Sequence, residues 1–288
     1  MKRLFSLFVL IVVVGALFGF STKDYKIYNT KTNKYVKLSQ MAKESQKADV
    51  VFFGELHDNA LLHWLEIEYL KAYYKINKDI TISMEMFERD TQSFVNEYLS
   101  DEISEEEFLQ NSRAWGNYLT DYKPIIEFAK EKNLHVIAAN VPRYIAALVN
   151  KNGLIVLDSL SAQEKKWVAK SVNTDDGHYK DKFYSLMGDN SPMMHGDFLD
   201  RLFAAQCVKD NTMAESIRDY LSDNSQQRII HYNGDFHSQS HLGTVERLGT
   251  NIKSLVISTV IKNKGEKLII SPDVDLSIAD YIIIINQN

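Results

Sequence analysis

The chain has 288 residues, of which 45% are hydrophobic and 25% are charged, and its formal net charge is −5. This composition indicates a folded protein with a sizeable core, built as one large domain or two small ones. The acidic balance and the lack of any block of basic residues exclude nucleic acid as a partner.

The N-terminus differs from the rest of the chain. Two basic residues precede an uncharged apolar run from Leu4 to Phe20, and a polar sequence follows. This order is typical of a secretory signal, although an uncleaved membrane anchor has a similar pattern. We therefore expect residues 1–20 to be a signal peptide or anchor and residues 21–288 to form a single α/β domain. The protein is expected to be exported, and to be periplasmic or membrane-associated.

Cysteine usage limits how an exported chain of this kind is anchored or cross-linked. The sequence LFGF, from Leu17 to Phe20, resembles a bacterial lipoprotein processing site, but Phe20 stands where the acylated cysteine is needed. The sequence therefore does not support a lipid anchor at this site. Cys207 is the only cysteine, which excludes an intrachain disulfide, and its surroundings favour a buried apolar residue over a nucleophile.

Strands and helices alternate along the chain after the leader. In chain order, the pattern predicts a hairpin around 30–33, a helix over 38–45, a strand over 49–53, a helix over 60–75, a strand over 79–87, helices from about 90 and over 103–110 and 122–133, a strand over 134–141, helices over 142–153, 162–172 and about 198–221, a strand over 228–234, a short helix over 244–249, and strands over 252–261 and 280–286. Ser161 and Glu164 form a capping box in front of the helix predicted over 162–172.

The strands are continuous apolar runs, which is typical of strands buried on both faces. We therefore predict an α/β fold with a central, mostly parallel sheet and helices on both faces. An irregular inserted segment is expected near 175–197. In folds of this class, ligands bind at the carboxyl ends of the strands.

One short pattern occurs twice at such strand ends. The sequence GELH places Glu55 and His57 after the first buried strand, and GDFH places Asp235 and His237 after a later one. In both, a glycine allows a tight turn and a close approach of other groups. Two copies of glycine-acid-x-histidine, both after apolar strands, predict a shared polar site at one edge of the sheet.

Other strands add polar groups at the same edge. Glu85 and Glu88 end the second predicted strand, and Asn140 and Arg143 follow the third. The candidate catalytic residues are therefore Glu55, His57, Glu85, Arg143 and His237. Four of these could also bind a divalent metal, namely His57, His237, Glu55 and Glu85. The alternative is a structural polar network that only locks the strand ends together.

The two G-x-x-H motifs, the glutamate of EMF at Glu85 and the arginine of NVPR at Arg143 resemble the ChaN-like haem-binding lipoproteins. That family lies within a wider group that includes Tiki metal-dependent proteases and TraB proteins, and the resemblance covers essentially the whole mature chain. It implies an exported protein concerned with haem or iron uptake. In the protease branch the motif histidines and the glutamates carry a metal, which leaves a metal-dependent hydrolase or protease as the alternative function.

A haem site needs a flat apolar slit, an axial ligand and basic groups for the propionates. The segment near 175–197 supplies candidates for each. The predicted haem-binding residues are Tyr179, Tyr184, His178, His195, Lys180, Lys182, Met193 and Met194. With the resemblance, a tyrosine is the favoured axial ligand, with Tyr179 first and Tyr184 second. A slit on one protomer would leave the haem half exposed, so a haem-bridged homodimer is expected; the alternative is a lid that fills a gap between helices.

Overall fold

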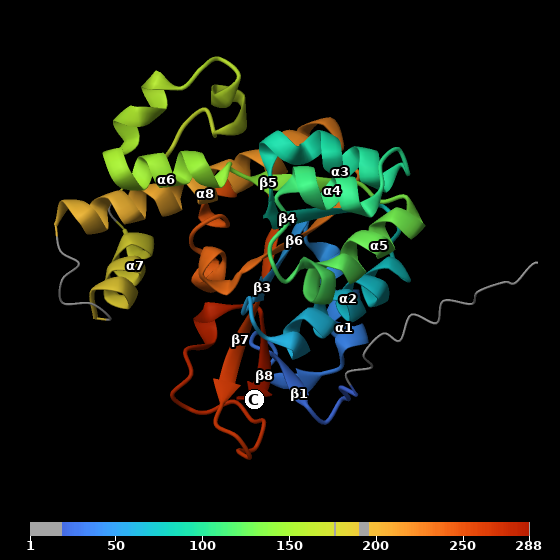
Figure 1. Ribbon diagram of the computed structural model, residues 1–288. Helices are drawn as coiled ribbons and strands as arrows, with labels where there is room; N and C mark the ends of the chain where they lie inside the picture. The colour runs from blue at the N-terminus through green and yellow to red at the C-terminus, as the bar shows by residue number, and fades with distance from the viewer. Residues whose placement is uncertain (1–18, 176, 190–195, 288) are drawn as a thin grey trace, which may run out of the picture.

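The structure is a computed structural model that describes residues 19–175, 177–189 and 196–287, and in these residues eight strands form one sheet (Figure 1). The strands are Tyr25–Asn29 (β1), Lys34–Val36 (β2), Val50–Glu55 (β3), Ile80–Glu88 (β4), Val136–Asn140 (β5), Arg228–Gly234 (β6), Ser254–Lys262 (β7) and Tyr281–Asn286 (β8). Their order in the sheet is β2-β1-β8-β7-β3-β6-β4-β5. β1 pairs antiparallel with β2 and with β8, and the remaining pairs are parallel. The predicted fold class is confirmed.

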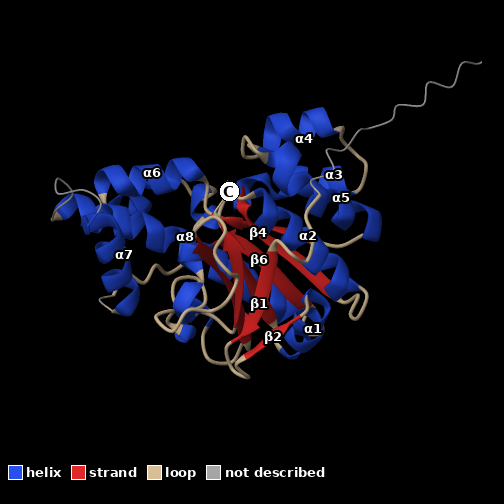
Figure 2. Cartoon of the chain, turned by 90° about the horizontal axis from the view of Figure 1, so that it is seen from below, coloured by secondary structure: helices blue, strands red, loops and turns tan. Residues whose placement is uncertain are grey.

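Helices cover both faces of this sheet, as Figure 2 shows. The α-helices are Leu38–Glu44 (α1), Ala60–Tyr74 (α2), Gln92–Leu99 (α3), Glu105–Ser112 (α4), Lys123–Lys132 (α5), Arg143–Asn152 (α6), His178–Asp189 (α7) and Asp197–Asp223 (α8). α1 to α5 lie on one face, and α8 packs on the other with α6 beside it. A three-layer arrangement of this kind buries a parallel sheet on both sides.

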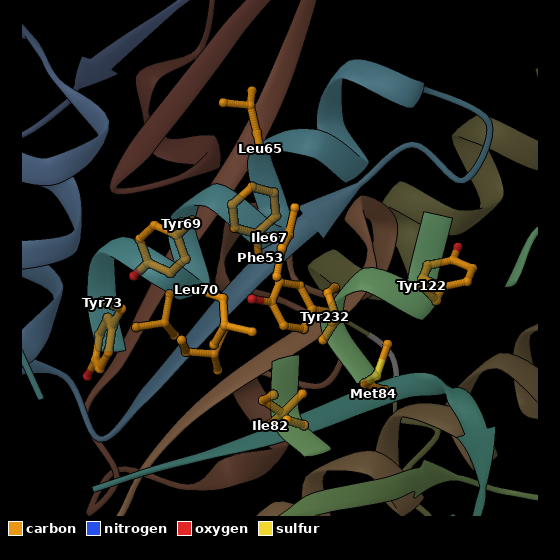
Figure 3. Close-up of a cluster of buried hydrophobic side chains, with 14 of the residues drawn as sticks. Phe53, Leu65, Ile67, Tyr69, Leu70, Tyr73, Ile82, Met84, Tyr122 and Tyr232 are labelled. Carbon is orange, nitrogen blue, oxygen red and sulfur yellow. The ribbon is translucent and has the colours of Figure 1, made fainter. Parts of the chain in front are cut away.

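β3 shows how one strand serves both layers of the core. Val51 and Phe53 point to the face covered by α2, where Figure 3 shows Phe53 close to Tyr69 and Tyr232. Val50 and Phe52 point to the face covered by α8. Since alternate side chains of a strand point to opposite faces, an unbroken apolar run is what burial on both faces requires.

Two segments differ from their predicted structure. Around 162–172 only a 3-10 turn forms, Glu164–Trp167, although both capping contacts between Ser161 and Glu164 are present. The chain then leaves the helical path because the backbone N–H groups of Ala169 and Lys170 donate to α8 side chains.

The segment expected to be irregular contains α7, which packs against the N-terminal half of α8 (Figure 1). Tyr179 and Phe183, one helical turn apart, place their rings 5.8 and 5.4 Å from that of Phe203. Cys207 is buried in the same cluster, as predicted, and burial raises the pKa of its thiol to about 12.

The leader falls almost entirely outside the described residues, which begin at Gly19. Phe20 is described and packs its ring against Trp64 at 6.0 Å. In the part of the chain that the structure describes, no helix has the length and apolarity that crossing a membrane requires.

Candidate functional site

Three neighbouring strands end together at the centre of the sheet. β6 lies between β3 and β4, and Glu55 at the end of β3 pairs with Gly234 at the end of β6. The pairing of β4 with β5 shifts register between Met84 and Glu88, and such irregularities are common beside functional sites. This edge brings together four of the predicted site residues, Glu55, His57, Glu85 and His237.

The two motif glycines lie where the strand ends come closest. A Cβ at Gly234 would lie 2.7 Å from His57 Nε2 and 3.6 Å from Glu85 Oε2, so the missing side chain is what lets these two groups approach. A Cβ at Gly54 would overlap Asp235 Oδ1 and lie 3.0 Å from the backbone oxygen of Ile257. Both positions therefore exclude any larger residue without a local rearrangement.

His57 is held by its own motif acid. His57 Nδ1 lies 2.6 Å from Glu55 Oε1, which also accepts a 2.7 Å hydrogen bond from the Tyr122 hydroxyl. Glu55 is buried, whereas 46% of the His57 side chain is exposed. Burial alone would lower the pKa of His57, but the hydrogen bond to Glu55 and the charge of Glu85 raise it. The result is an accessible imidazole on a fixed carboxylate.

His237 is buried and pairs with acids from other elements. Its Nδ1 lies 2.7 Å from Asp210 Oδ1 on α8, and its Nε2 lies 3.2 Å from Glu85 Oε1 on β4. Burial would lower the pKa of His237, but the charges of Glu85 and Asp210 outweigh burial and raise it to about 10. The same ion pair holds the pKa of Glu85 well below its usual value, against the effect of burial. His237 is therefore an imidazolium between two carboxylates at neutral pH.

Asp235, the acid of the second motif, does not pair with His237. Asp235 Oδ2 accepts hydrogen bonds from Ser258 and Gln239, and burial raises the pKa of this carboxyl to about 6. Lys182 lies nearby, with its Nζ 3.2 Å from the backbone oxygen of Gln239, and burial lowers the pKa of that ammonium to about 8. Asp235 and His237, two residues apart, thus belong to different environments.

Arg143 lies outside the acid–histidine cluster. Its Nε donates to Glu88 Oε1 at 2.5 Å, and Arg113 donates to the other oxygen of Glu88 at 2.7 Å. The Arg143 side chain is 57% exposed. Its contact is therefore with the neighbouring acid of the same strand end, and not with Glu85.

The four predicted metal ligands do not converge on one point. Glu55 is turned toward His57 and α2, while Glu85 is turned toward His237 and the backbone N–H of Gly234. Among the described residues, the side chains close enough to share one ion are Glu55, His63 and Glu66, whose ligand atoms all lie within 4.8 Å of one another. The motif set as predicted does not fit a single metal ion, so we derive no catalytic step through one.

The predicted haem residues fall on α7 and on the segment that follows it. His178 is exposed at the start of α7, whereas Tyr179 is buried and donates a 2.6 Å hydrogen bond to Asp210 Oδ2. Burial and the charge of Asp210 raise the pKa of Tyr179 well above its usual value. Tyr184 is half-buried and donates to the exposed carboxylate of Asp200.

The remaining haem candidates are distributed as follows. Lys180 lies 3.6 Å from Asp200 and close to the Tyr184 ring, while Lys182 points inward toward Gln239. The candidates outside the described residues are Met193, Met194 and His195.

Three buried ionisable residues that contact the strand-end motifs were not among the predicted site residues. Asp210 lies on α8 among apolar residues, and His63 and Glu66 lie on the buried face of α2. The signal was present in each case: an acid or histidine at a position where the helical spacing calls for an apolar residue. A buried acid needs a partner, so such positions mark either an ion pair or a ligand.

Comparisons with known proteins identify a family for this chain. A family model described as haem-binding uptake, Tiki superfamily, ChaN, matches residues 41–248. This range includes both G-x-x-H motifs, α7 and α8. Among curated proteins, none matches the sequence.

Several solved structures are similar to this chain, and one of them has a TM-score above 0.5. ChaN of Campylobacter jejuni, described with cofacial haem binding, superposes with a TM-score of 0.68 at 17% identity, covering 92% of this chain and 98% of that one. An erythromycin esterase, EreC, matches with a TM-score of 0.48 at 12% identity over 82% of this chain and 77% of its own. A protein from Bacillus cereus matches with a TM-score of 0.49 at 11% identity over 87% and 92%.

Proposed function

The chain belongs to the ChaN family of haem-binding uptake proteins of the Tiki superfamily. We propose that it binds haem on the solvent-exposed surface of α7 and α8, which pack against each other and are called the α7–α8 hairpin from here on. The family match supports haem binding in general, and the surface composition of α7 and α8 supports this position for it. Haem uptake requires a ligand that is captured and later released, and an open surface suits this exchange better than the buried edge of the sheet.

The hairpin has the composition that a haem face needs. Leu186 is 47% exposed and Phe198 is 40% exposed, so apolar side chains reach the surface on both helices. Tyr184 and Met187 lie half-buried beside the aromatic core of the hairpin. Lys180 supplies a cation for a propionate. Apolar surface, a phenol and a cation are the features that bind the ring, the iron and the carboxylates of haem.

The geometry favours Tyr184 over Tyr179 as the axial ligand. For Tyr179 to bind iron, its hydroxyl would have to leave Asp210, which is fully buried and would then lose one of its donors. Tyr184 donates to Asp200, whose side chain is 57% exposed and can turn to water instead. Replacing the phenolic proton of Tyr184 by iron therefore disturbs the protein less.

A homodimer and export complete the proposal. A haem on this face would remain partly exposed on one protomer, and a second copy stacked face to face would cover it, as cofacial binding in the Campylobacter protein suggests. The basic start and apolar run of residues 1–20 support export to the periplasm or membrane surface, with Phe20 in place of an acylated cysteine.

The haem proposal is tested by titrating the mature protein with hemin and recording the Soret band. Tyr184→Phe should weaken binding by at least about tenfold, which is the loss expected for one axial bond. Tyr144→Phe is the matched control, since Tyr144 is also a surface tyrosine that donates to a carboxylate, Glu164. A wild-type protein with no Soret shift would end the haem proposal.

The choice of ligand is tested separately. Tyr179→Phe should keep the Soret band of the wild type, at some cost in stability. If it removes the band from a folded protein while Tyr184→Phe keeps it, the ligand is Tyr179. Sedimentation with and without hemin tests the dimer, which should form in proportion to bound haem.

A hydrolase is the second candidate function, and His57 is the observation that favours it. Its Nδ1 is fixed by a buried glutamate, and its other nitrogen faces Glu85 at an accessible strand end. This is the arrangement of a general base with an orienting carboxylate. Turnover of model esters and peptides that disappears in His57→Ala would support it. Equal background rates for both proteins would exclude it.

A further inference from the structure

Behind His57, on the side of α2, three ionisable side chains are enclosed together. Glu55, His63 and Glu66 are at most 4% exposed. His63 Nδ1 lies 3.0 Å from Glu66 Oε2 and 3.5 Å from Glu55 Oε2. None of the three is needed for the proposed haem face, and only Glu55 belongs to a G-x-x-H motif.

The second nitrogen of His63 fixes which atom faces the two glutamates. His63 Nε2 lies 3.2 Å from the backbone oxygen of His57 and 3.5 Å from Asp121 Oδ2, and both of these atoms are acceptors. In the neutral ring the proton therefore belongs on Nε2, and Nδ1 presents its lone pair to the carboxylates. A lone pair facing two carboxylates is repulsive unless a positive centre lies between them.

The two carboxylates also lack a positively charged or hydrogen-bonding partner on one oxygen each. Glu55 Oε2 and Glu66 Oε1 are buried and have no hydrogen-bond partner, whereas Glu55 Oε1 is fully engaged with His57 and Tyr122. Buried carboxylates persist when they are paired, protonated or bound to a metal. In the part of the chain that the structure describes, neither glutamate forms an ion pair with a lysine or an arginine.

We propose that Glu55, His63 and Glu66 bind one divalent first-row metal ion, with Mn²⁺ and Zn²⁺ as the best-matched species. Two carboxylates and a neutral imidazole carry a charge of −2, so a divalent ion makes the buried cluster neutral. Mixed nitrogen and oxygen ligands suit these ions. Ligands about 2.0–2.2 Å from a metal lie roughly 3–3.6 Å from one another, which matches the two distances from His63 Nδ1.

The surrounding contacts resemble the outer partners of known metal sites. A metal-bound histidine usually donates its other N–H to a carbonyl or carboxylate, which fixes the ring and its tautomer. Asp121 and the His57 carbonyl are placed to accept from His63 Nε2, and Asn117 donates to both of them at 2.7 and 3.0 Å. The ion would bind Glu55 Oε2 and so fix the carboxylate whose other oxygen, Oε1, orients His57.

The metal content of the protein tests this assignment. Wild-type protein produced with Mn²⁺ or Zn²⁺ in the medium and then dialysed should contain about one ion per chain by elemental analysis. Glu66→Gln should contain almost none, and Glu68→Gln, two residues along the same helix and outside the cluster, should match the wild type. Removing the ion by unfolding in chelator and refolding should lower the Tm.

Two results would overturn the assignment. Metal-free wild-type protein from every medium, with a Tm that Glu66→Gln raises, would mean that a proton shared by the two glutamates takes the place of the ion. Metal that is lost in His237→Ala but kept in Glu66→Gln would place the ion at the strand-end motifs instead. If Glu66→Gln fails to fold, the wild-type metal content and a visible Co²⁺ spectrum on refolding decide the matter.

Discussion

The two G-x-x-H motifs share a pattern and a position at the sheet edge, yet their side chains are connected differently. In GELH the acid is the partner of its own histidine, since Glu55 holds His57 at 2.6 Å. In GDFH the acid turns away to Ser258, and His237 takes its partners from β4 and α8. One histidine is half exposed and the other is buried.

This difference separates two tasks. His237 joins three elements through an ion-pair network, which suits a group that holds the strand ends and α8 together. His57 is attached to one rigid carboxylate and remains accessible, which suits a group that meets a ligand or substrate. A repeated motif therefore indicates a common backbone geometry and not a common role.

The largest effect should come from removing the buried acid on the His237 side. Asp210 accepts from His237, Tyr179 and Thr244, so Asp210→Ala leaves a buried imidazolium and two hydroxyls without their partner. We expect the free energy of unfolding to fall by about 3–5 kcal/mol in urea titrations. Asp200→Ala, on the exposed side of the same helix, is the control and should cost less than about 1 kcal/mol. A small loss for Asp210→Ala would remove the structural role assigned to His237.

The pH dependence of stability should also single out His237. Its folded pKa is raised to about 10 from 6.5, so its contribution is fully present below about pH 6.5 and is lost as pH rises through about 10. The pKa of Glu85 is lowered, so its contribution is present above about 4.5 and is lost as pH falls. Unfolding measured from pH 6 to 10.5 should show a loss of a few kcal/mol in the wild type.

The matched variant for this measurement is His237→Gln, which should show a flatter profile over the same range. His57→Gln should keep the wild-type slope, because that ring is half exposed and solvent screens its pair with Glu55. Parallel profiles for the wild type and His237→Gln would contradict the assignment of the imidazolium to His237.

The sequence was informative about the sheet edge and uninformative about its contacts. Apolar runs such as VVFF and RIIHY identify strands buried on both faces, and parallel strands place their carboxyl ends at one edge, so the meeting of Glu55 with the His237 strand was predictable. The direction of Asp235 was not, because it lies in a 3-10 turn whose side chains no longer alternate as in a strand. The contact of Asp210 with His237 was not predictable either, because Asp210 is 25 residues before Asp235 and its position in space depends on how α8 packs on the sheet.

The hairpin was only partly predictable for a related reason. The composition of the segment near 175–197 predicts a ligand-binding region, and that stays a prediction, but α7 was missed because its apolar stripe is short. The sequence alone does not reveal how the hydroxyls of Tyr179 and Tyr184 are placed. Only the packing of α7 on α8 reveals that one hydroxyl is buried on Asp210 and the other is near solvent.

The two motif glycines give a smaller and more specific test. In Gly54→Ala the new Cβ meets a buried carboxylate and, at 3.0 Å, a backbone oxygen of β7, neither of which can move freely. In Gly234→Ala the new Cβ comes too close to the half-exposed ring of His57, while Glu85 Oε2 lies at an ordinary contact distance of 3.6 Å. We expect losses of about 3 and about 1 kcal/mol in the free energy of unfolding. Equal losses would mean that the two strand ends are equally confined.

The smallest expected effect on stability comes from substituting Asp235, the motif acid that contacts Ser258 and Gln239 instead of His237. Asp235 has a folded pKa of about 6 against an ordinary value of 3.8. Its contribution to the free energy of unfolding is therefore fully present below about pH 4 and is lost as pH rises through about 6. Asp235→Asn keeps an acceptor for Ser258 and Gln239 and removes the cost of burying a charge, so its stability at pH 8 should match or exceed the wild type by up to about 1 kcal/mol. At pH 4 the two proteins should be equally stable.

Thermal melts at both pH values, with Asp210→Asn as the comparison variant, measure the contrast between the two acids directly. The Asp210 variant should be clearly destabilised at pH 8. If both substitutions are equally costly, the two acids act alike and the division between the motifs is wrong.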